Sequence, residues 1–69
     1  MKKIKIKVNG KVKIVLNNSK LSDLLNNLNI PIKKVAIELN QEIIDKKRTS
    51  NIKLKEDDKI EIVHFIGGG

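Results

Sequence analysis

The chain has 69 residues, 39% of them hydrophobic, and a formal net charge of +7 at pH 7. This length allows one domain with a thin core between a sheet and a helix, and leaves little material for a deep catalytic cavity. The absence of cysteine excludes disulfides, thiolate metal sites and a side chain that could hold a persulfide.

The basic charge is compatible with nucleic acid, an anionic membrane or an acidic protein as a partner, and also with the abundance of Lys, Ile and Asn that AT-rich DNA encodes. Nucleic acid is not expected, because bases stack on aromatic or Arg side chains and the chain offers Phe65 and Arg48 alone. No apolar run approaches the roughly 20 residues that span a bilayer. The first residues alternate Ile with Lys, unlike the apolar core of a signal peptide, so we expect a cytoplasmic protein without membrane contact.

A β-hairpin is predicted at the start of the chain. Residues 3–8 alternate lysine with apolar residues, which is the pattern of a strand with one face in the core. Asn9-Gly10 predicts a two-residue turn, because both residues tolerate positive φ. Residues 11–16 form the second strand. The expected core residues of the two strands are Ile4, Ile6, Val8, Val12, Ile14 and Leu16.

The next segment changes to a helical period. Four leucines at helical spacing predict a helix from Lys20 to Leu28. Ser19 is the expected N-cap, and Asp23 lies in the first turn, where the helix dipole favours an anion. Asn29 can take the left-handed conformation that ends a helix, and Pro31 forbids its continuation.

The second half of the chain reads as short strands and loops. Residues 35–39 alternate again, the dipeptide 40–41 is a predicted turn, and residues 43–44 start a short edge strand. Residues 46–51 are polar and read as irregular. The remaining expectations are a loop that packs on the core through Ile52 and Leu54, an acidic turn at 56–58, and a last strand over 59–65 with Ile60 and Ile62 inward.

This order predicts an α+β protein with the β-grasp (ubiquitin-like) layout. We expect a mixed sheet of four to five strands with one helix packed across one face. Residues 1–66 would form a single domain, followed by a flexible glycine tail at 67–69.

The three glycines at the end of the sequence point to chemistry at a terminus. A glycine tail can thread a channel too narrow for any other residue, and it presents a bare α-carboxylate. That group must be activated before it accepts a nucleophile, for example as an acyl-adenylate made from ATP. The phosphate-binding pattern that ATP requires is absent, so the activating machinery must belong to a partner. Taken alone, a short glycine run is also typical of a disordered end or an engineered scar.

Four segments together resemble the ThiS family of sulfur carriers in thiamine thiazole biosynthesis. These segments are residues 9–10, 20–25, 35–40 and 59–69. The resemblance implies that a ThiF-type enzyme adenylates Gly69, using ATP and Mg²⁺, while this chain binds no cofactor. Gly69 would then become a thiocarboxylate that donates sulfur to a ThiG-type thiazole synthase. Gly67 and Gly68 would be the thin part of the tail.

A docking patch is expected beside that tail. Val63 and Phe65 lie out of phase with the inward isoleucines of the last strand, so they should face the open side of the sheet, joined by Ile66 and Val15. Five lysines are expected on the same side, where they could meet an acidic partner or keep the sheet from aggregating: Lys3, Lys5, Lys7, Lys11 and Lys13.

No catalytic constellation is found. His64 is the single histidine and has no nucleophile or metal co-ligand nearby in the pattern, so a structural role is expected. The chain is therefore predicted to be a protein co-substrate rather than an enzyme, and a monomer when free. Three alternatives remain open: a MoaD-type carrier for molybdopterin or another sulfur pathway, a basic β-grasp module that binds RNA or protein, and a modifier conjugated to lysines.

Overall fold

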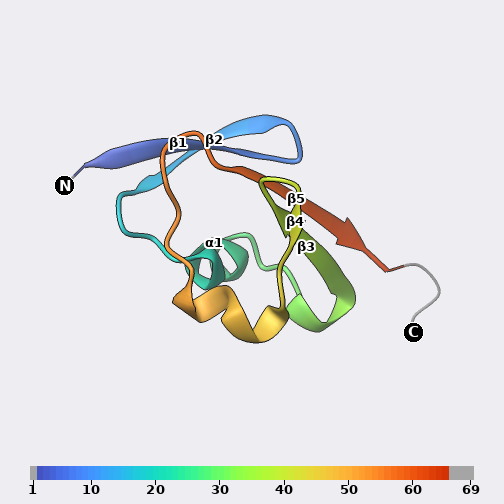
Figure 1. Cartoon of the computed structure of the whole chain (residues 1–69). Helices are drawn as coiled ribbons and strands as arrows, with labels where there is room; N and C mark the ends of the chain where they lie inside the picture. Colours follow the sequence, from blue (N-terminus) through green and yellow to red (C-terminus); the bar gives the residue numbers. More distant parts are fainter. Residues whose placement is uncertain (1, 66–69) are drawn as a thin grey trace.

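The computed structural model describes residues 2–65, and Met1 and residues 66–69 lie outside that description. Five strands form one mixed sheet in the order β2-β1-β5-β3-β4. Helix α1 (Leu21–Asn27) packs against one side of this sheet (Figure 1). The 3-10 helix η2 (Lys46–Asn51) contacts α1 on that side. We call that side the helix side and the opposite side the open face.

Strand β5 lies at the centre of the sheet and is parallel to β1 and antiparallel to β3. A second 3-10 helix, η1, leads into β3. The element bounds are β1 (Lys3–Val8), β2 (Lys11–Leu16), η1 (Ile32–Lys34), β3 (Val35–Leu39), β4 (Glu42–Ile43) and β5 (Lys59–His64).

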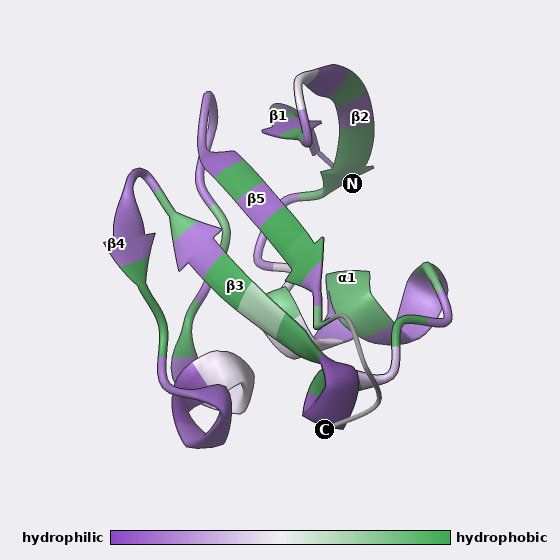
Figure 2. Ribbon diagram, turned by 90° about the vertical axis from the view of Figure 1, so that its right-hand side faces the viewer, coloured by the Kyte–Doolittle hydropathy of each residue, from purple (hydrophilic) through white to green (hydrophobic). Residues whose placement is uncertain are grey.

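The core lies between the sheet and α1. The alternating bands along β5 and β3 in Figure 2 reflect side chains that point to opposite faces of the sheet. Leu54 is buried and Ile52 packs against the same cluster, so the predicted packing of this loop is confirmed. The buried apolar side chains are Ile4, Ile6, Leu21, Leu24, Leu25, Val35, Ile37, Ile44, Leu54, Ile60 and Ile62.

The prediction that the apolar residues at positions 12, 14 and 16 of β2 face the core is wrong. Val12, Ile14 and Leu16 are 58%, 54% and 46% exposed. The two-residue turn sets Val8 opposite Lys11, and this register pairs Ile4 with Val15. Residues directly opposite in an antiparallel pair share a face, so turn geometry overrides the apolar pattern of the strand.

The turns follow their predicted chemistry. Asn9 and Gly10 have φ values of 51° and 83°, and Asn40 and Gln41 have values of 52° and 72°. These left-handed pairs close the β1–β2 and β3–β4 hairpins. Asn29 has a φ of 57° at the end of α1, as expected.

Two local predictions need correction. The N-cap of α1 is Lys20 rather than Ser19, and the Lys20 N–H donates to Asp23 Oδ2 at 2.9 Å. Residues 46–51 form η2 rather than an irregular loop. Asp45 caps this short helix by accepting from the Lys47 N–H, and the Thr49 hydroxyl donates to the Lys46 carbonyl. These two polar side chains therefore have partners within the helix and its cap.

The acidic turn before β5 supports the fold. Asp58 is 8% exposed, and its carboxylate accepts from the Lys55 N–H at 2.8 Å and from Asn40 Nδ2 at 3.0 Å. These bonds satisfy a buried charge and tie the turn to the β3–β4 hairpin. Within residues 2–65, no helix combines the length and apolar character that crossing a membrane requires.

Candidate functional site at the end of strand β5

The predicted docking residue Val63 lies on the open face near the end of β5. It pairs with Ala36 of β3 and is 58% exposed. The neighbouring Ile62 points to the helix side and is buried. Val63 is thus an apolar side chain on a rigid central strand, available for contact with another molecule.

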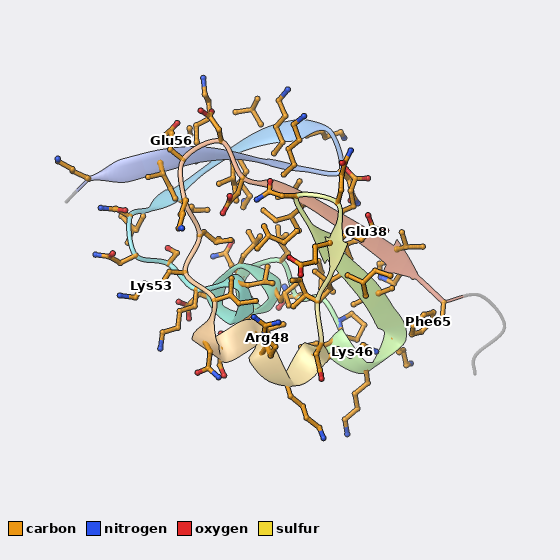
Figure 3. All side chains as sticks on the ribbon, viewed as in Figure 1. Glu38, Lys46, Arg48, Lys53, Glu56 and Phe65 are labelled. Atoms are coloured by element: carbon orange, nitrogen blue, oxygen red, sulfur yellow. The ribbon has the colours of Figure 1, made fainter. Side chains whose placement is uncertain are left out.

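Phe65 follows the strand and is held by two contacts from distant segments. Its N–H donates to the Lys34 carbonyl at 2.9 Å, which extends the pairing of β5 toward η1. The Lys46 ammonium lies 4.9 Å from the centre of its ring, within the range of a cation–π contact (Figure 3). The ring is still 55% exposed. The backbone of Phe65 is therefore hydrogen-bonded to the protein, while about half of its side chain faces solvent.

Val15 does not join this patch. It lies opposite Ile4 and packs against the core from the helix side. The expectation that placed it on the open face followed from the wrong phase of β2. Ile66 and the predicted tail, Gly67, Gly68 and Gly69, lie outside the described residues.

The lysine face is smaller than predicted. Lys3, Lys5 and Lys7 share the open face, whereas Lys11 and Lys13 lie opposite Val8 and Ile6 and belong to the helix side. A hollow of about 360 Å³ on the sheet is lined in part by Lys5, Lys7, Val12, Asp57 and Lys59. Three lysines and one aspartate line it beside apolar residues, so a net positive charge faces the hollow.

Asn9 contacts β5 in a way that the sequence pattern did not reveal. Its Oδ1 accepts from the Ile62 N–H at 2.7 Å, and its Nδ2 donates to the Ile62 carbonyl at 3.2 Å. The two residues are 53 positions apart. The Asn-Gly motif predicted a turn, and no local pattern indicates which distant strand the amide contacts.

The site contains no enzyme-like constellation within residues 2–65. His64 is exposed and pairs across the sheet with Val35, and the structural role expected for it stays a prediction. No group of three or more side chains there could hold a metal ion. The geometry instead shows a strand end that is hydrogen-bonded on both edges and carries an exposed apolar side chain.

Comparison with known proteins gives the family. The ThiS family model matches residues 6–69. The sulfur carrier protein ThiS of Bacillus subtilis is 43% identical over 65 residues, which cover 93% of this chain and 98% of that protein. The crystal structure of the thiamine biosynthesis protein ThiS from Geobacter metallireducens superposes with a TM-score of 0.83 at 29% identity, covering 96% of this chain and 100% of that one.

A longer relative contains a similar segment. A thiazole synthase of Magnetococcus marinus is 39% identical over 66 residues, which cover 96% of this chain. The chain spans 20% of the length of that synthase. The sequence similarity therefore extends to one part of a larger protein that is named for thiazole formation.

Fold and site define a small β-grasp protein with exposed apolar side chains at the end of its central strand. The chain belongs to the ThiS family. The predicted family, β-grasp fold and sulfur-carrier class are thereby confirmed, and membership in that class makes the chain a protein co-substrate rather than an enzyme.

Proposed function

We propose that this protein carries sulfur as a thiocarboxylate on Gly69 and delivers it for thiazole formation in thiamine biosynthesis. The observation that supports this most is the position of β5. It is the central strand, it is held by β1 and β3, and its sequence continues through Phe65 and Ile66 into the three glycines at 67–69. A firmly held strand followed by residues without side chains suits delivery of a chain end into a partner enzyme.

The proposed chemistry has two steps, both on the partner. A Gly69 carboxylate oxygen attacks the α-phosphorus of ATP, and pyrophosphate leaves with its charge balanced by Mg²⁺. A hydrosulfide ion then attacks the acyl carbon of the adenylate, AMP leaves, and one proton is released. The net change on the carrier is the replacement of one oxygen atom by sulfur.

The partners follow from the same proposal. A ThiF-type enzyme would bind ATP and Mg²⁺ and activate the terminus. A ThiG-type thiazole synthase would receive the sulfur, and the similarity to part of the Magnetococcus marinus thiazole synthase supports this pairing. Relatives named for thiamine and thiazole favour this pathway over the molybdopterin alternative. Reaction with these partners would take place in the cytoplasm, with the free carrier a monomer.

Docking on the activating enzyme would use the apolar side chains at the end of β5. Val63 and Phe65 are the described members of this patch, and Ile66 is the proposed third. Interfaces place aromatic and aliphatic anchors at their centre and charges at their rim. Lys3, Lys5 and Lys7 lie on the open face beside the start of β5, with Lys7 opposite Lys59, so they would meet acidic groups only of a partner that extends to that end of the strand.

Intact mass measurement tests the proposal directly. The protein is incubated with ATP, Mg²⁺, the cognate ThiF-type enzyme and a sulfide source, beside a variant that lacks Gly69. A mass gain equal to the exchange of one oxygen for sulfur in the full chain, and none in the variant, is expected.

Two results would contradict the proposal. No gain with an enzyme shown to be active on its own carrier would remove the carrier chemistry. An equal gain in the variant would remove the assignment to Gly69. Binding to RNA that falls steeply with salt and survives the deletion would instead favour the binding-module alternative.

A further inference from the structure

The Asn9 side chain does more than its turn requires. A φ of 51° followed by glycine explains why Asn suits this position, and Asp or Gly would serve the turn as well. Yet the amide is directed away from its own hairpin and forms two hydrogen bonds with Ile62. The Asn9 N–H also donates to the Ile60 carbonyl at 2.9 Å. One residue therefore provides three hydrogen bonds to β5.

These bonds extend a short pairing. The parallel register of β1 and β5 joins Lys7 with Lys59 and Val8 with Ile60. Beyond Ile60, the chain of β1 turns into the hairpin, while β5 runs on to His64. A carboxamide offers the same donor and acceptor as a peptide group. The Asn9 amide thus acts as one further peptide unit of β1 and holds β5 two residues before its end.

The opposite edge of β5 is held by backbone pairing. Strand β3 pairs with β5 from Val35–His64 to Leu39–Ile60, and the Phe65 N–H donates to the Lys34 carbonyl. Without the Asn9 amide, the last part of β5 would keep this one neighbour. A strand bonded along one edge can twist about that edge, which changes the direction in which the following residues leave the sheet.

We infer that Asn9 is a positioning residue for the reaction at Gly69, fixing the direction in which the chain end leaves β5. The inference rests on the proposed carrier function. It is distinct from docking, because Asn9 acts through Ile62 and the strand rather than through contact with the partner. Its loss should therefore lower the turnover number of the activating enzyme more than the affinity for the carrier.

Asn40 provides a matched control. It is also a left-handed Asn in a two-residue turn, with a φ of 52°. Its Oδ1 accepts from the Lys59 N–H at 2.9 Å, and its Nδ2 donates to Asp58. It therefore holds the beginning of β5, whereas Asn9 holds the end. Asn9→Gly and Asn40→Gly each remove two side-chain bonds without strain, since glycine accepts positive φ.

The experiment measures kcat and KM of the ThiF-type enzyme with each carrier variant, together with the thermal midpoint of each variant. Asn9→Gly is expected to lower kcat about tenfold with KM changed less than about twofold, because misplacement of a reacting group costs rate. Asn40→Gly is expected to keep kcat near the wild-type value at a similar loss of thermal stability. Asn9→Asp keeps the acceptor for the Ile62 N–H, so its kcat should lie between wild type and Asn9→Gly.

Amide exchange provides a readout that needs no enzyme. The Ile62 amide should exchange faster in Asn9→Gly than in Asn40→Gly. Equal kcat values for the two glycine variants, an effect of Asn9→Gly confined to KM, or an unchanged Ile62 exchange rate would each overturn the inference. If the wild-type carrier itself gains no sulfur, the proposed function fails. If it gains sulfur and Asn9→Gly reacts equally well, the positioning role alone fails.

Discussion

Both faces of the sheet carry aliphatic side chains, but these are buried on the helix side and exposed on the open face. On the helix side, Ile37 and Ile60 are at most 1% exposed. On the open face, Val63 and Ile43 are 58% and 76% exposed. Burial removes the first pair from water and stabilises the fold, whereas the second pair is left available for contact. A single sheet thus has its stabilising core on one side and exposed apolar side chains on the other, and substitutions on the two sides should have different effects.

The largest effect is expected in the core. Ile37→Ala should lower the free energy of unfolding by about 2–5 kcal/mol, because it removes buried methyl groups and leaves a cavity. A loss of this size is a large fraction of the stability of a small domain. Urea denaturation measures it. The control Ile43→Ala should change stability by less than about 0.5 kcal/mol, and an equal loss in both variants would remove the distinction between the faces.

A charge on the open face should affect the partner reaction instead. Val63→Glu is expected to lower kcat/KM of the activating enzyme about tenfold, because it places a charge at the centre of the proposed docking patch. Its stability should change by no more than about 1 kcal/mol, the span of strand propensities. Ile43→Glu is the matched control on the same face. A similar kinetic loss in both variants would move the docking patch away from the end of β5.

The register of β2 gives a sharper comparison between neighbouring residues. Val15→Ala should cost about 1 kcal/mol, because Val15 packs on the core, while Ile14→Ala should cost less than about 0.5 kcal/mol despite removing more atoms. Thermal denaturation followed by circular dichroism resolves the two. The reverse order would indicate that β2 presents its other face to the helix.

The smallest expected effect is an increase in stability from a better N-cap on α1. Lys20 occupies the N-cap of α1 without a side-chain acceptor. Lys20→Ser offers a hydroxyl oxygen to the free N–H groups of the first turn and should raise stability by about 0.5–1 kcal/mol. Lys47→Ser is a control that removes the same charge elsewhere. A thermal midpoint that rises equally in both variants would indicate a charge effect rather than capping.

Local patterns were sufficient where one rule acted alone. The spacing of apolar residues was enough to predict β1, β3 and, from four leucines, the helix α1. Turn chemistry was enough to predict the left-handed Asn29. The prediction of the buried face of β2 was wrong because two rules conflict there. Its apolar residues favour one face, and the two-residue turn requires the other. The turn prevails, because β2 is an edge strand where exposure of Ile14 and partial burial of Lys13 cost little.

The site was predictable only in part, for a different reason. Val63 could be placed from the phase of β5, since Ile60 and Ile62 mark the buried side. Asn9 could not, because its partner lies 53 residues away and depends on which strands become neighbours. The same holds for Asn40 and Asp58. Contacts of this kind follow from topology, which period and turn chemistry leave open.

The Asn9 amide also affects how the protein ages. An Asn followed by Gly is prone to spontaneous deamidation, in which the next backbone nitrogen attacks the side-chain carbonyl carbon and ammonia leaves. Both polar atoms of this amide are bonded to Ile62, so the native fold keeps it from the Gly10 nitrogen. Prolonged warming that opens the hairpin would remove this protection, and stored samples would then lose the Nδ2 donor to the Ile62 carbonyl through chemical damage while the encoded sequence stays unchanged.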